Sequence, residues 1–149
     1  MMRHRSAIFA SILLAGMISL GLVSCSSAGP NLVGSALLGA QDANQARIDA
    51  VRLNTLGVAN MTQQRTEAAL ELFEQAYRTD TSFSTARLNE AIARFNLQQF
   101  DEALAILSEI TAEDPDNARA WYNLGLTHRN LGQSSDAVDA FERVIALDP

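Results

Sequence analysis

The feature that most constrains the fold is an internal repeat: over residues 50–149 the sequence matches itself when it is displaced by 34 residues. The aligned columns are Ala69, Ala103 and Ala137; Phe73, Leu107 and Phe141; Ala76, Ile110 and Val144; Asp80, Asp114 and Asp148; and the small residues Gly57, Ala91 and Gly125. A fixed period of roughly 20–50 residues is typical of arrays in which one supersecondary unit stacks on the next. Because such a unit cannot bury its apolar face alone, we expect a stack of units.

Each unit is predicted to be a pair of helices. Apolar residues recur at helical spacing in the first unit, from Leu53 and Leu56 to Ala69, Phe73 and Ala76. We interpret the columns of small residues as positions where the two helices of a pair cross closely. The column that contains Phe73 carries a large residue that fills the gap between units.

Turn signals separate these helical runs. Pro115 cannot continue a helix, and Asp116 or Asn117 can cap the helix that follows. A second turn is expected around Gly132. We therefore place helices near 43–63, 66–79, 83–97, 100–113, 118–131 and 134–147.

The repeat resembles the tetratricopeptide repeat (TPR). The third unit starts at Ala118 and matches the family pattern with Trp121, Leu124, Gly125, Ala137, Phe141 and Pro149. The first unit starts at Ala50 and matches with Leu56, Gly57, Ala69, Phe73 and Ala76, although Thr81 replaces the proline. The second unit starts at Ser84 and matches with Ala91, Ala103 and Pro115. The resemblance implies an all-α fold, an α-solenoid of three TPR helix pairs (about 50–83, 84–117 and 118–149) in a domain of residues 42–149.

Several residues depart from the TPR pattern. His128 stands at an aromatic position and Val144 at an alanine position of the third unit. The second unit carries Arg87, Glu90 and Arg94 where the family has an aromatic residue, a leucine and an aromatic residue. We expect Glu90 to form an ion pair with one of these arginines, because they lie on neighbouring helical turns.

The resemblance also implies a partner-binding groove, because the first helix of each TPR pair lines the concave side of the solenoid. The predicted groove residues are Asn54, Thr55 and Met61, with Val51, Val58 and Thr62; Leu88, Asn89, Ile92, Phe95 and Asn96, with Thr85; and Arg119, Tyr122, Asn123, Leu126, Arg129 and Asn130. Asparagine amides both donate and accept hydrogen bonds, and arginines suit a carboxylate. We therefore expect a groove for an extended or helical peptide. The alternative is that asparagine is simply tolerated on a solvated helix face.

One TPR subfamily clamps a C-terminal carboxylate with a Lys/Asn/Asn/Lys/Arg set. Asn89 and Arg119 resemble two members of that set, whereas Asn54, Val58 and Asn123 replace the other three. We therefore do not predict that ligand.

The first residues have the layout of a secretory signal. Arg3 and Arg5 form a basic start, and an apolar run follows over residues 7–23. The alternative is an uncleaved transmembrane helix, which requires roughly 20 apolar residues. The segment Leu22-Val23-Ser24-Cys25 resembles the lipobox of bacterial lipoproteins. That resemblance implies cleavage before Cys25, the single cysteine, and acylation of its thiol and new amino terminus.

The predicted organisation is therefore a lipoprotein signal peptide (1–24), a lipidated tether (25–41) and the TPR domain. The tether begins rich in serine, glycine and proline, which indicates a flexible segment, and a short helical turn is compatible with residues 36–40. If the host is Gram-negative, Ser26 after the cysteine resembles the outer-membrane sorting pattern of lipoproteins. That resemblance implies the periplasmic face of the outer membrane. The net charge is −6, and all 11 basic residues are arginine. Loss of Arg3 and Arg5 with the signal makes the remaining chain still more acidic, so we expect the acyl chains to be its main hold on a membrane. Nucleic acid is not expected as a partner.

No catalytic, metal or cofactor site is predicted. A structural zinc needs four nitrogen or sulfur ligands, and the chain offers two histidines and one cysteine. His128 is expected to be a packed or half-buried helix residue. The carboxylate pairs Asp101/Glu102 and Glu113/Asp114 are expected at helix ends.

The last predicted helix carries an apolar stripe, which is made of Val138, Phe141, Val144 and Ile145. We expect this stripe to be exposed, or to be covered by another subunit or by a downstream domain. The sequence thus predicts a lipid-anchored TPR scaffold that binds a protein or peptide in its concave groove. A role as an accessory or assembly factor of an envelope complex is compatible with this prediction. The alternative is the anchoring and presentation module of a longer secreted TPR protein.

Overall fold

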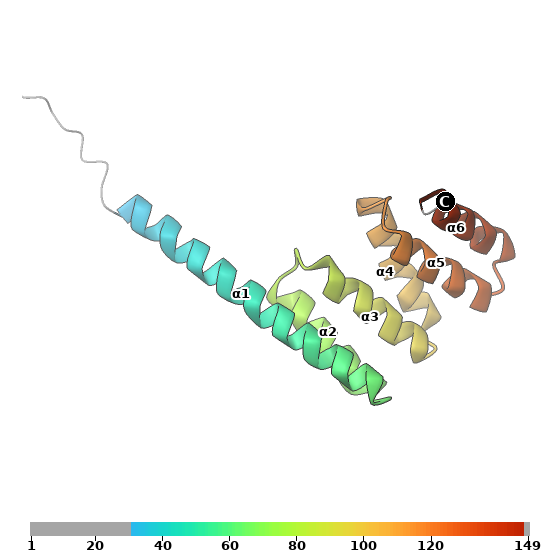
Figure 1. The fold of residues 1–149 in the computed structure, drawn as a ribbon, viewed down its shortest axis with the longest axis horizontal. Coiled ribbons are helices and arrows are strands. Elements are labelled where there is room, and N and C mark those ends of the chain that lie inside the picture. Colours follow the sequence, from blue (N-terminus) through green and yellow to red (C-terminus); the bar gives the residue numbers. More distant parts are fainter. Residues whose placement is uncertain (1–30, 148–149) are drawn as a thin grey trace, which may run out of the picture.

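The computed structural model describes residues 31–147, and the side chains of residues 39–147. This part of the chain forms six helices and no strand. The helices are α1 (Asn31–Thr62), α2 (Thr66–Thr79), α3 (Ser84–Asn96), α4 (Phe100–Glu113), α5 (Ala118–Asn130) and α6 (Ser134–Leu147). Each helix packs against the next one along the chain, so the pairs α1/α2, α3/α4 and α5/α6 follow one another as an α-solenoid (Figure 1). The fold class is confirmed, and the bounds of α2 to α6 agree with the predicted helices to within one residue.

The two helices of a pair cross closely at the predicted small residues. A β-carbon built on Gly57 would lie 2.5 Å from Cε1 of Phe73, and one built on Gly125 would lie 2.7 Å from Cε1 of Phe141. Both distances are shorter than van der Waals contact. An aromatic ring from the second helix therefore rests directly on the backbone of the first helix, and it does so twice at equivalent places.

The buried apolar residues form several small clusters along the stack. One cluster joins α3, α4 and α5 and contains Leu107, Ile110 and Leu124. Another joins the first pair to α3 and contains Ala76, Phe83 and Ala86. This distribution is expected of a solenoid, in which each pair buries its apolar face against its neighbours.

The turns inside the three pairs share one backbone conformation. Gln64, Gln98 and Gly132 have φ values of 59°, 63° and 76°, and they are spaced by one repeat. A residue in the left-handed region at this place ends the first helix and reverses the chain. Between the pairs, the side chain of Asn117 caps α5 by accepting a hydrogen bond from the backbone nitrogen of Ala120 at 3.0 Å. The sequence predicted either Asp116 or Asn117 as the cap of α5, and the structure shows that it is Asn117.

Glu90 is buried and forms ion pairs with both of its neighbouring arginines. Its carboxylate lies 2.9 Å from Nη1 of Arg87 and 3.1 Å from Nε of Arg94. Arg94 also reaches Glu74 on α2 at 2.7 Å, and Arg87 reaches Glu109 on α4 at 3.0 Å. The expected pairing is confirmed, and it extends into a network that connects three helices. Burial of these charges is tolerated because each one has an opposite partner.

Helix α1 is longer than expected. It begins at Asn31, so residues 31–41 are helical and the predicted flexible tether is wrong for this segment. Alanines and leucines there favour a helix more than Gly34 and Gly39 oppose it. The first half of α1 projects beyond the other helices (Figure 1). Residues 31–46 correspond to an arm of about 24 Å.

The base of this arm is held by the loop between α2 and α3. Arg47 donates to Asp80 at 2.9 Å, and its guanidinium lies 4.5 Å from the centre of the Phe83 ring. Asp80 also accepts hydrogen bonds from the hydroxyl and the backbone nitrogen of Ser82, at 2.6 and 2.9 Å. The bonds from Ser82 and Arg47 hold the pKa of Asp80 below its ordinary value. The contact therefore persists until the pH falls well into the acid range.

The signal peptide, the lipobox with Cys25, and residues 25–30 of the predicted tether lie outside the described residues. Among the helices that are described, none has the length and apolar content that a membrane crossing requires.

Helix α6 exposes the apolar stripe that its sequence predicted. Val138 is 54% exposed and Ile145 is 67% exposed, while Phe141 and Val144 are half-buried. The residue that corresponds to Phe141 in the first unit, Phe73, is only 1% exposed. The difference arises because α3 covers α2, whereas within the described residues no further helix covers α6.

Two glycines of α1 allow a matched test of the close helix crossing. We expect Gly57→Ala to lower the free energy of unfolding by about 1–2 kcal/mol, because the buried ring of Phe73 cannot move away. Gly39→Ala meets nothing within 4 Å, so it should raise stability by up to about 1 kcal/mol through helix propensity. Urea unfolding of both variants checks the prediction, and equal effects of the two substitutions would contradict it.

Candidate functional site

The first helices of the three pairs lie next to one another and form the inner face of the solenoid. Helix α3 contacts both α1 and α5, whereas the second helices α2, α4 and α6 make no direct contact with one another. Because the first helices are closer together, the stack curves with α1, α3 and α5 on its concave side. This is the face on which the sequence placed the groove.

A line of polar side chains crosses this concave face. Asn89 on α3 donates from Nδ2 to Oδ1 of Asn54 on α1 at 2.8 Å. Its own Oδ1 accepts a hydrogen bond from Nη2 of Arg119 on α5 at 3.3 Å. We call these three residues the polar ladder. Asn89 is only 7% exposed, so its amide mainly orients its two neighbours and leaves the exposed guanidinium of Arg119 for a ligand.

A cavity of about 140 Å³ opens beside the polar ladder. Its lining combines apolar side chains with the amide and the guanidinium of the ladder, and consists of Val58, Met61, Thr62, Phe73, Asn89, Ile92 and Arg119. The structure thus brings together predicted groove residues from all three units. A mainly apolar cavity with a few polar groups is the usual form of a side-chain pocket.

Phe73 is the lining residue that was not predicted. It belongs to α2, and it reaches the concave side because Gly57 leaves room for its ring. The aligned column of Gly57, Ala91 and Gly125 was the signal that could have revealed this.

Other predicted residues lie on the same face but bond to their own helices. Thr55, Asn123 and Asn130 donate to backbone carbonyl oxygens four residues earlier, at 2.7–2.8 Å. The side-chain oxygen of each of these residues remains able to accept a hydrogen bond. Asn96 and Arg129 are exposed near the ends of α3 and α5.

The predicted apolar groove residues differ in accessibility. Leu88 is only 5% exposed and belongs to the core between α3, α4 and α5, so the prediction that it lines the groove is wrong. Phe95 is half-buried with its ring 5.5 Å from that of Phe100. Tyr122 is exposed, and its ring lies 6.0 Å from that of Phe141. Leu126 is half-buried.

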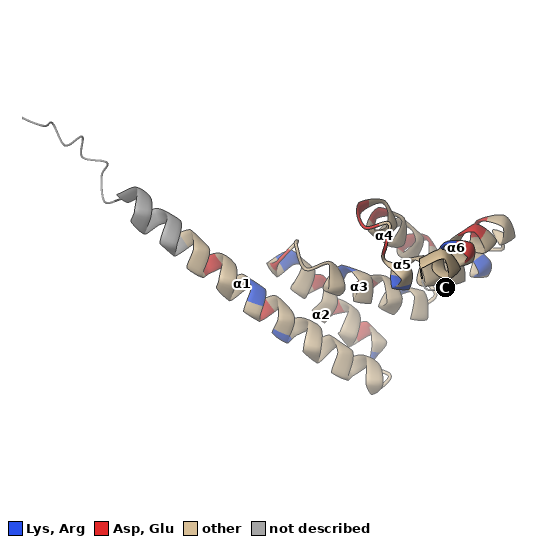
Figure 2. Cartoon of the chain, turned by 45° about the horizontal axis from the view of Figure 1, so that its top comes forward, with Lys and Arg blue, Asp and Glu red and all other residues tan. Residues whose placement is uncertain are grey.

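Acidic and basic residues are interspersed along the helices (Figure 2). His128 is half-buried, and its Nδ1 lies 2.6 Å from Oε1 of Gln133. Its nearest carboxylate oxygen, on Asp136, is 4.0 Å away. Within residues 39–147, no group of three or more histidine, cysteine or acidic side chains is arranged to hold a metal ion.

Two family models, both described as tetratricopeptide repeat, match residues 60–125 and 118–149. Residues 60–149 therefore consist of tetratricopeptide repeats.

Two curated plant proteins share part of this sequence. The Hsp70-Hsp90 organizing protein of Triticum aestivum is 29% identical over 93 residues, which are 62% of this chain and 16% of that protein. Protein NPG1 of Arabidopsis thaliana is 39% identical over 46 residues, which are 31% of this chain and 6% of that protein. The chain thus spans less than a fifth of the length of either relative.

Solved TPR structures share the fold. The second TPR of Spaghetti (RPAP3), bound to an HSP90 peptide, has a TM-score of 0.66 at 22% identity and covers 70% of this chain and 96% of that one. The TPR domain of Arabidopsis OM64 has a TM-score of 0.67 at 19% identity, over 70% of this chain and 86% of that one. MamA has a TM-score of 0.64 at 23% identity, over 78% and 64% of the two chains.

The polar ladder makes a testable prediction about two asparagines at the same repeat position. Asn89→Ala removes the partner of both Asn54 and Arg119, so it should lower the free energy of unfolding by about 1–2 kcal/mol. Asn123→Ala removes only a bond to its own helix and should change stability by less than about 0.5 kcal/mol. Thermal and urea unfolding measure both changes. A larger loss for Asn123→Ala would show that the ladder is not a stabilising unit.

Proposed function

We propose that this chain is a scaffold that binds a segment of a protein partner along its concave face and is held at a membrane by acyl chains on Cys25. The observation that carries the first half is the cavity beside Arg119, which gathers residues from α1, α2, α3 and α5. A partner that occupies it would contact three consecutive units at once.

The chemistry of the groove favours a peptide with an aliphatic side chain next to an acceptor. A cavity of about 140 Å³ with Val58, Met61 and Ile92 in its wall suits a side chain of the size of leucine or methionine. The guanidinium of Arg119 is exposed, and it suits a carboxylate or a backbone carbonyl. The acceptor oxygens of Thr55 and Asn123 suit the backbone N–H groups of such a peptide.

The comparisons support a peptide as the ligand class. The second TPR of Spaghetti is described with an HSP90 peptide bound, and another structure of this fold, YrrB, is described as a TPR protein with an unusual peptide-binding site. YrrB has a TM-score of 0.64 at 24% identity, over 68% of this chain and 52% of that one. These ligands are those of the other proteins. For this chain the proposed class of ligand is a peptide segment, whose sequence need not resemble that of the HSP90 peptide.

The membrane half of the proposal depends on the lipobox. Leu22, Ser24 and Cys25 stand in the order that lipid attachment and cleavage require, after an apolar run of the kind that secretory signals contain. Several acyl chains on one residue anchor a protein stably, whereas one chain does not. The proposed location is the outer membrane, on the periplasmic face, if the host is Gram-negative.

A second candidate function is supported by α6. Its exposed Val138 and Ile145 are suited to cover a further domain or subunit, so the chain would then present such a domain at the membrane. An accessory role in assembling an envelope complex is compatible with both candidates.

The groove is tested with a photo-crosslinking amino acid at Val58, on the rim of the cavity, and at Ala112, on the exposed surface of α4. In the native host we expect a discrete adduct from position 58 and none from position 112. Arg119→Ala should reduce the adduct at least five-fold, whereas Arg78→Ala, on the exposed surface of α2, should not. An adduct that is indifferent to Arg119 would contradict the proposed groove.

The anchor is tested by Cys25→Ser. We expect the variant to lose both its acyl mass and the cleavage before residue 25, because both steps require the thiol of Cys25, so that the apolar run of residues 7–23 is retained. Intact-protein mass spectrometry measures both effects. Ser27→Ala is the control and should keep both the acyl mass and the cleavage. An unmodified protein that carries no acyl mass, or a Cys25→Ser variant that keeps it, would contradict lipid anchoring.

A further inference from the structure

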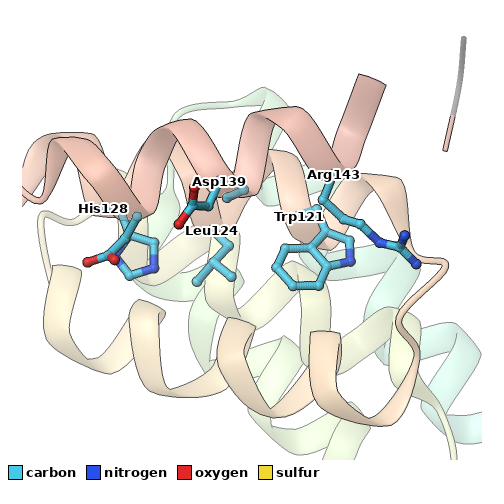
Figure 3. A pocket seen from close by; sticks show the side chains of 7 residues that line it. Trp121, Leu124, His128, Asp139 and Arg143 are labelled. Atoms are coloured by element: carbon cyan, nitrogen blue, oxygen red, sulfur yellow. The ribbon is translucent and has the colours of Figure 1, made fainter. Parts of the chain in front are cut away.

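A second and larger cavity lies between the helices of the last pair, and it shares no residue with the concave groove. Its volume is about 430 Å³. Helix α5 contributes Trp121, Leu124 and His128, and α6 contributes Asp136, Asp139 and Arg143 (Figure 3). We call it the outer cavity.

The two ends of the outer cavity differ in chemistry. At one end, Arg143 donates to the backbone oxygen of Pro115 at 3.2 Å and to Asp116 at 3.4 Å. The indole N–H of Trp121 donates to the same Pro115 oxygen at 2.9 Å. The donors at this end are therefore already bonded to the loop before α5.

The other end offers acceptors. Asp136 and Asp139 bring two carboxylates, and Figure 3 shows Asp139 on the same side of the cavity as His128. Nδ1 of His128 lies 2.6 Å from Oε1 of Gln133 and 4.0 Å from a carboxylate oxygen of Asp136. Leu124 and Ala140 form an apolar floor between the two ends.

The preceding pair shows what the fold accommodates at these positions. Trp121, Leu124 and His128 occupy the repeat positions of Arg87, Glu90 and Arg94. In that pair the guanidiniums of Arg87 and Arg94 are bonded to the carboxylates of Glu90, Glu109 and Glu74. In the last pair the carboxylates of Asp136 and Asp139 line the cavity, and the guanidinium that also lines it, that of Arg143, is bonded to the loop before α5.

We propose that the outer cavity receives an arginine side chain of a partner protein. The methylene groups of that arginine would lie on Leu124 and Ala140, beside the ring of Trp121. Its guanidinium would donate to Asp139 and Asp136. Arginine fits better than lysine because its planar group can donate to two carboxylates at once and stacks on aromatic rings. This inference is independent of the concave groove, because a partner can dock here whether or not the groove is a peptide site.

The single tryptophan of the chain reports on this cavity directly. The probes are N-acetyl-L-arginine amide and its neutral isostere N-acetyl-L-citrulline amide, titrated against the protein while Trp121 fluorescence and the indole N–H resonance are followed. We expect saturable changes with the arginine probe and a dissociation constant at least five-fold lower than with the citrulline probe.

A matched pair of variants tests the carboxylate. Asp139→Asn should raise the dissociation constant of the arginine probe to that of the citrulline probe. Asp42→Asn removes the same charge from exposed α1 and should leave binding unchanged. Circular dichroism checks that both variants keep the helical fold. Equal binding of the two probes by the unmodified protein, or an Asp139→Asn variant that binds arginine as before, would overturn the proposal.

Discussion

The rest of the structure depends on the close approach of two helices at a residue without a side chain. Where Gly57 meets Phe73 and where Gly125 meets Phe141, a ring sits on helix backbone, and this contact sets how closely the two helices approach in the first and last pairs. The three pairs then stack so that α3 contacts both α1 and α5. The concave face is thus a consequence of packing within and between the helix pairs. The polar ladder exists because this packing places α1, α3 and α5 side by side.

Much of the fold could be predicted because it repeats. The columns of Ala69 and Phe73, together with Pro115 and Gly132, located five helices to within a residue. Helix α1 was the exception, since its first residues lie outside the repeat and glycines there suggested a flexible segment. Helix propensity alone decides such a stretch, and it is a weaker signal than a packing period.

The site was harder to predict than the fold. Repeat position identified which residues share the concave face, and Met61, Asn89, Ile92 and Arg119 do line one cavity. The repeat position of Leu88 did not reveal that its side chain is buried in the core. The helix face that lines the groove has one edge that is buried and one that is exposed. Nor could repeat position reveal the bond between Asn54 and Asn89, which depends on the spacing of two helices. A hydrogen bond between side chains of different units depends on how the units stack, so the sequence of a single unit does not predict it.

The projecting half of α1 fixes how the concave face is turned relative to the first residue of that helix. A helix advances about 1.5 Å and turns about 100° with each residue. Adding or removing one residue between Asn31 and Arg47 would therefore swing the solenoid about the helix axis by more than a quarter of a circle while scarcely changing its reach. A disordered linker would average such differences away. The number of residues in the arm therefore sets the direction of the concave face relative to Asn31, where the described helix begins.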